Sequence, residues 1–365
     1  MTRILLWDEA PGEIRAGISE NGNLVELRIL RPQVSSVSPG THYTARIKQI
    51  IGSGKALVDL GRDGDAQLEF ARSMPEGAIL AVEIVRSAIP EPGRWKLPLA
   101  RLAMEFVPQA NLGPHGEDSA VARFLKQMAV SADEVVCARP QTAVEVKTIL
   151  ADAVESSVRP ELFDAADFDS LIEQAVSGEF PIAGGMLSIE RSRAMTLIDI
   201  DGSGDPMQLN LAASREIPKL LRLLDIGGQV GIDFLALPDK KARQMLDAAL
   251  AEECSVLGPH ERTAANGFGF VQIVRPRPGP SIPEIVSGTM PGRLSLESRA
   301  IALLRAAARS TGFGMRRLVA PPAVIEKLRE WPDELDRLRR LLGAEIVTVP
   351  DSSASGYGHV HVHQS

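Results

Sequence analysis

The sequence predicts an α+β protein built from several modules, and two patterns carry that prediction. Residues 39–104 form a series of short β-rich runs separated by glycine-containing turns, which is typical of a five-stranded OB-type barrel. Residues 182–285 alternate strand, helix, strand, helix and strand, which indicates a layered α/β module. Because 365 residues exceed one ordinary hydrophobic core, we expect several domains.

The first 38 residues predict a small antiparallel sheet. The apolar run ILLW precedes the alternating segment EIRAGISENGNLVELRILRP, in which Asn21-Gly22 marks a two-residue hairpin. The barrel begins after Ser38-Pro39-Gly40. Its expected strands are TARIKQII, KALVDLG, DAQLEF and AILAVEIVRSAI, and the Pro- and Gly-rich stretch AIPEPGRWKLP closes it.

Helical spacing of apolar residues follows the barrel. The segments VARFLKQMAV, TAVEVKTILADAV and FDSLIEQAVSG predict helices, with DEVVCAR as a short strand among them. In the layered module, GGMLSIERSRAMTLIDIDGSG, QVGIDFLAL and FGFVQIVRP predict strands, and REIPKLLRLLDIGG and DKKARQMLDAALAEEC predict helices. After RPRPGPSIP, the helix LSLESRAIALLRAAARS and the strand EIVTVP predict a final αβ unit.

The composition excludes several classes of protein. No apolar run approaches the roughly 20 residues that cross a bilayer, so no membrane span is expected. Acidic Asp8, Glu9 and Glu13 stand where a secretion signal would be apolar, which favours the cytoplasm. Two distant cysteines, Cys137 and Cys254, cannot form a disulfide framework or a cysteine zinc site. A net charge of −7 argues against a protein that coats nucleic acid, but not against a nuclease.

Carboxylates inside apolar strands are the strongest chemical signal. Asp199 and Asp201 lie in TLIDIDGSG, and Asp233 lies in VGIDFLAL. Such residues must be paired, metal-bound or at a strand end, because burying a lone charge is costly. Two or three of them brought together would suit Mg²⁺ or Mn²⁺. Spacing alone favours the simpler interpretation, that these aspartates cap strands and turns.

Two sequence blocks resemble the ribonuclease E/G family. GGMLSIERSRAMTLIDIDGSG is similar to a motif in which a double glycine leads through a glutamate and a threonine to isoleucine, aspartate, valine or isoleucine, and asparagine. QLNLAASREIPKLLRLLDIGGQVGIDFLAL resembles the next block, in which an asparagine-led helix runs through a double glycine to a second catalytic aspartate. Further similarity, in FGFVQIVRPRPGPS and ARPQTAVEVKTIL among others, extends it to nearly the whole chain.

This resemblance implies a particular arrangement of modules and a particular site. The expected modules are a split RNase-H-like module at 1–38 and 105–181, an S1-type OB barrel at 39–104, a DNase-I-like α/β catalytic module at 182–285 and a small C-terminal domain at 286–365. By this likeness Asp199 and Asp233 fall on the two metal-binding aspartates. Arg275 or Arg277 falls on a basic strand end.

The chain departs from the family pattern at the site and in the barrel. Asp201 stands where the family has an asparagine that orients the phosphate, which adds charge and removes a hydrogen-bond donor. Leu57 and Gln67 stand where the family's barrel carries base-stacking phenylalanines, so we expect weak RNA binding unless basic residues compensate. The basic candidates are Arg46, Lys48, Lys55 and Lys96, for which an ordinary solvated surface is an equal explanation.

Two family segments are absent from the sequence. IVSGTMPG follows Pro283-Glu284 in place of a paired-cysteine zinc link, so neither zinc nor a zinc-linked homo-oligomer is expected. LARLAMEFVPQANLGPHGEDSAVARFL stands in place of the 5′-monophosphate sensor, so selection of RNA ends by that route is not expected. Near the end, the alternating His359, His361 and His363 could bind a metal, but exposed terminal histidines are more often incidental.

The sequence therefore predicts a cytoplasmic Mg²⁺-dependent endoribonuclease that hydrolyses single-stranded RNA in RNA processing or decay. Asp199 and Asp233 would bind the ion with help from Asp201, and Arg275 or Arg277 would stabilise developing charge. One alternative is an RNA-binding protein of the same fold with weak or no cleavage, which the lost phenylalanines, sensor and zinc link favour. A second is a protein-partner module in a larger RNA-decay assembly.

Overall fold

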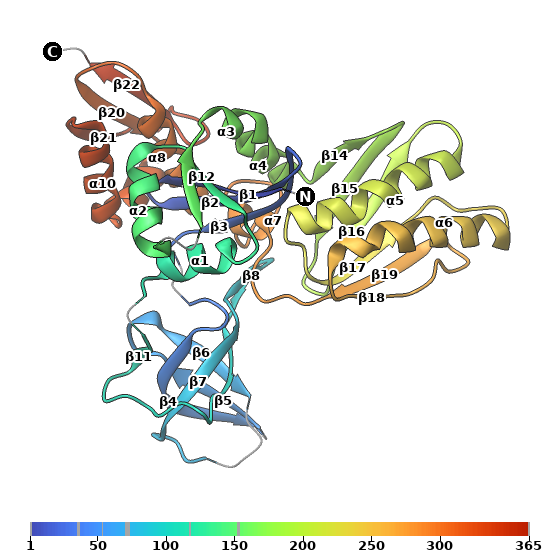
Figure 1. Ribbon diagram of the computed structural model, residues 1–365, viewed down its shortest axis with the longest axis horizontal. Helices are drawn as coiled ribbons and strands as arrows, with labels where there is room; N and C mark the ends of the chain where they lie inside the picture. The colour runs from blue at the N-terminus through green and yellow to red at the C-terminus, as the bar shows by residue number, and fades with distance from the viewer. Residues whose placement is uncertain are drawn as a thin grey trace.

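A computed structural model describes residues 2–34, 37–52, 54–69, 74–116, 118–151 and 154–363 (Figure 1). Some residues of the predicted segments lie outside these described ranges. They are Ser53, Phe70, Asp152, Ala153, Gln364 and Ser365. Within the described residues, no helix has the length and apolarity needed to span a membrane.

The first sheet joins two parts of the chain that the barrel separates. Its strand order is β13-β12-β1-β2-β3. The strands are β1 (Arg3–Ala10), β2 (Glu13–Glu20), β3 (Asn23–Leu30), β12 (Glu134–Cys137) and β13 (Glu155–Val158). The predicted hairpin at Asn21-Gly22 is present, with positive φ at both residues. Strands β12 and β13 add in parallel beside β1, so the predicted antiparallel sheet is larger and mixed.

Helices cover both faces of this sheet. They are α1 (Ala120–Ala129), α2 (Pro140–Leu150), α3 (Glu161–Ala166) and α4 (Phe168–Ser177). Leu5 and Trp7 of β1 pack in one core with Leu125 of α1, whereas the alternate residue Leu6 belongs to the core that holds Phe168 of α4. The strand period of two thus divides β1 between two cores.

A closed barrel forms the second β-rich region. Its strands are β4 (His42–Gly52), β5 (Lys55–Asp59), β6 (Asp65–Glu69), β10 (Leu99–Leu102) and β7 (Ile79–Arg86). They follow each other in that order and β7 pairs back with β4, so the described residues confirm a closed five-stranded barrel, consistent with the S1/OB type. The short elements β11 (Gly113–Pro114) and η1 (Gly61–Asp63) accompany it.

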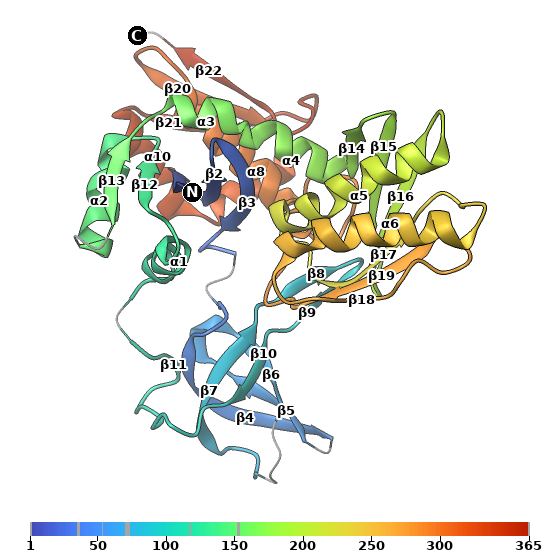
Figure 2. The same ribbon diagram turned by 45° about the vertical axis from the view of Figure 1, so that its right-hand side comes forward.

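A hairpin outside the barrel reaches toward the rest of the molecule (Figure 2). It consists of β8 (Ile89–Glu91) and β9 (Arg94–Lys96). The backbone N–H of Gly93 donates to the carbonyl of Thr289 at 2.9 Å, and Arg193 Nε donates to the carbonyl of Pro92 at 3.0 Å. The barrel is therefore fastened beside the layered α/β region.

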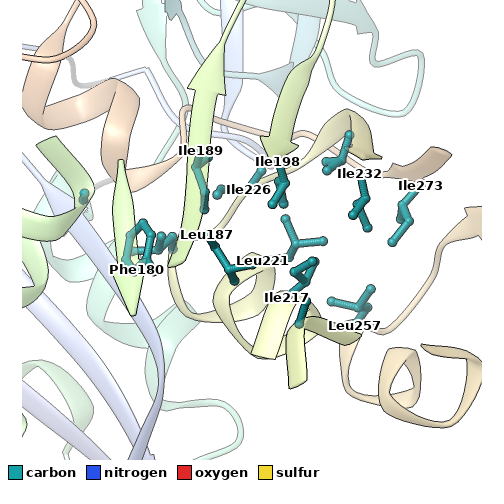
Figure 3. Packing of buried hydrophobic residues seen from close by; sticks show 14 of the residues in the cluster. Phe180, Leu187, Ile189, Ile198, Ile217, Leu221, Ile226, Ile232, Leu257 and Ile273 are labelled. Carbon is teal, nitrogen blue, oxygen red and sulfur yellow. The ribbon is translucent and has the colours of Figure 1, made fainter. Parts of the chain in front are cut away.

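The layered region has the sheet order β14-β15-β16-β17-β19-β18. Its elements are β14 (Glu179–Ile182), β15 (Gly185–Arg191), β16 (Thr196–Gly202), α5 (Pro206–Leu223), β17 (Gly228–Asp233), α6 (Lys240–Glu253), η2 (Cys254–Leu257), β18 (Glu261–Arg262) and β19 (Phe270–Arg275). Ile198, Ile232 and Ile273 of the sheet pack against Ile217 and Leu221 of α5 (Figure 3). Helices α5 and α6 thus lie on one face of the sheet (Figure 1).

Helix α5 begins nine residues earlier than the periodicity of REIPKLLRLLDIGG predicts, because a capping residue and a proline set its start. Asp205 caps it by accepting from the N–H of Gln208, and Pro206 occupies the first turn, where its missing N–H costs nothing.

The last region is an αβ unit with a sheet of order β21-β20-β22. Its elements, with the short helix that precedes them, are α7 (Ile282–Ser287), α8 (Leu296–Arg309), β20 (Met315–Ala320), α9 (Pro322–Arg329), α10 (Pro332–Leu342), β21 (Ile346–Pro350) and β22 (His359–His363). The three alternating histidines lie on β22, which pairs antiparallel with β20. Their segment is thus an ordered strand, with the histidines on its exposed side.

Candidate active site

Asp199 and Asp233 are direct neighbours on two parallel strands. The register of β16 and β17 pairs Asp199 with Asp233, which is the last residue of β17. Neighbouring strands lie about 4.8 Å apart, so the two carboxylates leave the backbone from adjacent positions. Both residues are exposed, whereas the preceding Ile198 and Ile232 are buried. The alternation directs both aspartates to the face of the sheet opposite α5 and α6.

The neighbouring positions extend this pair into a row across four strands. Ser188 of β15 pairs with Asp199, and Phe270 of β19 pairs with Asp233. Asp201 is exposed two residues beyond Asp199 on the same strand face, opposite Met186 and beyond the end of β17. The three predicted site carboxylates therefore share one end of one sheet face.

The ring of Phe270 also lies on this face, although no sequence pattern indicated it. A Cβ added at Gly231 would lie 2.5 Å from Cζ of Phe270 and 3.1 Å from Cδ2 of Leu197. The ring therefore lies across Gly231 beside Leu197, which is 39% exposed. The absence of a side chain at position 231 makes room for an aromatic ring next to the aspartates.

The donor set suits a hard divalent cation with few protein ligands. Asp199 and Asp233 supply carboxylate oxygens, and among the described residues no group of three or more His, Cys, Asp or Glu side chains could hold a metal. Mg²⁺ commonly binds through one or two carboxylates and keeps the remaining positions for water and phosphate. Two exposed, adjacent carboxylates at an open face fit that requirement.

Asn210 fixes the backbone just beyond Asp233. It is fully buried on α5, its Nδ2 donates to the carbonyl of Leu235 at 2.8 Å, and its Oδ1 accepts from the N–H of Leu235 at 3.0 Å. A sequence signal was available, since an asparagine on the apolar side of an amphipathic helix needs hydrogen-bond partners. Asn210 is therefore a candidate positioning residue, and Asp205 serves as the cap of α5.

Arg275 and Arg277 lie at the other end of the sheet from the carboxylates. Arg275 pairs with Gly228, the first residue of β17, and its Nη1 donates to the carbonyls of Leu221 at 2.7 Å and Ile226 at 2.6 Å. Burial lowers the pKa of Arg275. Arg277 forms an ion pair with Glu284. This placement gives both arginines structural partners and leaves their predicted contact with RNA without support from geometry.

The barrel residues singled out from the sequence, together with Lys96 of the hairpin outside the barrel, offer few free positive charges. Leu57 and Gln67 pair directly across β5 and β6. Three of the basic candidates have acidic partners, which are Lys48 with Asp65 at 2.8 Å, Lys55 with Glu69 at 3.8 Å and Lys96 with Glu91 at 3.6 Å. Arg46 is exposed and has no ion-pair partner among the described residues.

Comparison with known proteins finds similarity to one family. The sequence model of the Ribonuclease E/G family matches residues 114–278, which include both aspartates. The chain is 27% identical over 302 residues to a chloroplastic Ribonuclease E/G-like protein of Arabidopsis thaliana, covering 75% of this chain and 28% of that protein. It is 31% identical over 136 residues to Ribonuclease E of Escherichia coli strain K12, covering 34% of this chain and 13% of that protein.

A third similar protein is Ribonuclease G of Escherichia coli strain K12, at 27% identity over 146 residues. That match covers 36% of this chain and 29% of Ribonuclease G, so the matched regions span less than a third of all three relatives. The resemblance expected from the sequence is confirmed, at low identity.

Proposed function

We propose that this chain is a member of the ribonuclease E/G family and acts as a metal-dependent endoribonuclease that hydrolyses single-stranded RNA. The observation that carries the proposal is the direct pairing of Asp199 and Asp233 on parallel strands, both exposed on the open sheet face. The proposed setting is RNA processing or decay in the cytoplasm.

In the proposed mechanism, Asp199 and Asp233 would hold Mg²⁺ or Mn²⁺. Such an ion, when bound, polarises a phosphodiester and lowers the pKa of a coordinated water. Asp201 would add negative charge beside the pair. Asn210 would keep the end of β17 in position through its two hydrogen bonds to Leu235. Phe270, opposite Asp233, would offer its ring to a base next to the scissile phosphate.

We also propose that the modules correspond to those of the family. Strands on both sides of the inserted barrel form one sheet, which supports a split RNase-H-like module at 1–38 and 105–181. A mixed sheet with helices on one face and carboxylates on the other is compatible with a DNase-I-like catalytic module at 182–285.

The test is Mg²⁺-dependent cleavage of a single-stranded RNA by the purified full chain. Asp199→Asn and Asp233→Asn should each lower cleavage by roughly 100-fold or more, because a neutral amide is a much poorer ligand for Mg²⁺. Asp239→Asn is the matched control, since its exposed side chain caps α6 and asparagine caps a helix equally well. Wild-type cleavage by either site variant would refute the site.

A non-cleaving RNA-binding protein of the same fold is the second candidate function. The pairing of Leu57 with Gln67 and the acidic partners of Lys48, Lys55 and Lys96 favour a protein whose barrel does not support cleavage. RNA binding by the wild type, with no cleavage in Mg²⁺ or Mn²⁺, would establish this candidate instead.

A further inference from the structure

A polar pocket of about 320 Å³ lies between the N-terminal sheet and the C-terminal helices. Its walls are the end of β1, the first turns of α2 and one side of α10. Helices α2 and α10 lie together on the opposite side of the molecule from β16 and β17 in both views (Figures 1 and 2). The pocket is therefore separate from the candidate active site.

The pocket occupies a favourable place in the sheet topology. Strands β1 and β12 are parallel, and the pocket lies where both end, beside the turn from β12 into α2. Ligands of α/β sheets commonly bind beyond the carboxyl ends of parallel strands. The first turn of α2 has Arg139 at its N-cap with no side-chain cap bond and Pro140 at the first position. Its free N–H groups and dipole favour an anion.

Thr142 provides a second, independent sign of a ligand. Thr142 lines the pocket and is only 8% exposed. Its hydroxyl has no hydrogen-bond partner among the described residues. Thr142 Oγ1 is not among the fully buried polar atoms that lack a partner, so the hydroxyl can be reached by a group inside the pocket that the residue lines.

The charged side chains of the pocket give it a positive excess. Arg139, Arg337 and Arg340 line it, against two glutamates, Glu9 and Glu145. Arg337 is neutralised by its ion pair with Glu9. Arg139 and Arg340 have no carboxylate partner within the described part of the chain. Two arginines are therefore left for an anion near the start of α2.

We propose that this pocket binds the phosphate group of a small phosphorylated molecule. The phosphate would accept hydrogen bonds from the first turn of α2, from the Thr142 hydroxyl and from Arg139 and Arg340. Glu145 would accept from a ligand hydroxyl group. A volume of about 320 Å³ is at the lower end of ligand pockets, which suits a mononucleotide or free phosphate.

The test measures binding of AMP and of inorganic phosphate to the full chain by calorimetry, in EDTA so that no metal site contributes. Thr142→Val removes the hydroxyl at nearly constant shape, and Arg340→Gln removes one free charge. Each should weaken binding at least about tenfold, since hydrogen bonds to charged groups are among the stronger ones. Tighter binding of AMP would identify a nucleotide as the ligand, and equal binding would identify the free ion.

Arg339→Gln is the matched control on the same helix, because Arg339 pairs with Asp336 and does not line the pocket. It should bind both probes like the wild type, and so should Asp199→Asn. The proposal fails if the wild type binds neither probe at millimolar concentration. It also fails if Arg340→Gln, on an exposed residue whose loss should not unfold the chain, binds like the wild type.

Discussion

The barrel and the β14–β19 sheet are the two regions expected to meet RNA, and they differ in what they keep. On the sheet, two carboxylates are side by side and exposed on neighbouring strands. On the barrel, the two positions that would stack bases carry Leu57 and Gln67. Its lysines Lys48 and Lys55 face acidic partners. The sheet carries the carboxylates proposed to hold a metal ion, whereas the barrel lacks the aromatic pair that would be expected to stack bases.

A site for bond cleavage and a surface for RNA binding can therefore diverge independently of each other. A pair of metal-binding aspartates requires only two adjacent strand positions, whereas binding of RNA by stacking and by positive charge requires many residues spread over a surface. Four variants of the chain test this difference and the structure that supports it.

The largest effect is expected from Glu13, which lies in neither region and should disable both. Its side chain is fully buried and pairs at 2.7 Å with Arg15 and at 2.7 Å with Arg31. Burial would raise the pKa of Glu13, but the arginines around it, Arg305 included, lower the pKa well below its usual range. Glu13→Gln leaves the buried Arg31 without a carboxylate partner and removes one partner of Arg15, so it should lower the free energy of unfolding by about 3–5 kcal/mol.

Urea unfolding followed by circular dichroism measures this change. The control is Glu216→Gln, which removes an exposed partner of Lys219 and should have little effect. Equal midpoints for the two variants would contradict the structural role of the buried ion pairs.

Restoring aromatic rings to the barrel should give the next largest effect. In the double variant Leu57→Phe with Gln67→Phe, the two paired positions would present neighbouring rings. Stacking contributes about 1–3 kcal/mol per base, so affinity for a single-stranded RNA should rise accordingly. Fluorescence anisotropy measures the affinity for RNA. Both barrels are compared in the Asp233→Asn background, so that the RNA is not cleaved during the measurement. Unchanged affinity would mean that the barrel does not face RNA.

Releasing Lys48 should have a smaller effect that depends on salt. Asp65→Asn removes the carboxylate that Lys48 contacts at 2.8 Å and 2.9 Å. If the lysine then contacts a phosphate, the slope of log affinity against log salt should steepen by about 0.7. Asp118→Asn, which frees Lys126 outside the barrel, should leave the slope unchanged.

The smallest effect concerns acid stability at the ion pairs of Asp169. Burial would raise the pKa of Asp169, but its hydrogen bonds and ion pairs with Arg15 and Arg309 lower it to about 2. The lowered pKa means that the contribution is complete above the unfolded-state pKa of about 3.9 and disappears as the pH falls through about 2. Because the side chain is 50% exposed, we expect less than about 1 kcal/mol.

Melting temperature against pH compares the wild type with Asp169→Asn. The wild type should be more stable at neutral pH, and the two curves should converge between about pH 4 and pH 2. Curves that stay parallel over that range would contradict the assigned ion pairs.

Much of the fold and the candidate carboxylates could be predicted because their signals are local. The hairpin at Asn21-Gly22, four of the five barrel strands and the alternation around Asp199 and Asp233 all follow from neighbouring residues. The expected closing stretch AIPEPGRWKLP instead contributes the hairpin of β8 and β9, and Leu99–Leu102 supplies the fifth strand of the barrel. Strand β13 was missed because ESSV carries little apolar pattern, and Asn210 was not assigned its positioning role because its partner is 25 residues away.

Local patterns along the chain predict that two aspartates lie in apolar strands and that the barrel lacks two aromatic rings. Three features become visible only in the folded chain. The two strands are neighbours in register, Arg275 donates to backbone carbonyls, and a polar pocket lies between α2 and α10. The two groups of features differ in the range of the interactions that produce them. Side-chain alternation and turn conformation act over a few residues, whereas strand order, buried ion pairs and cavities depend on segments that meet only when the chain has packed.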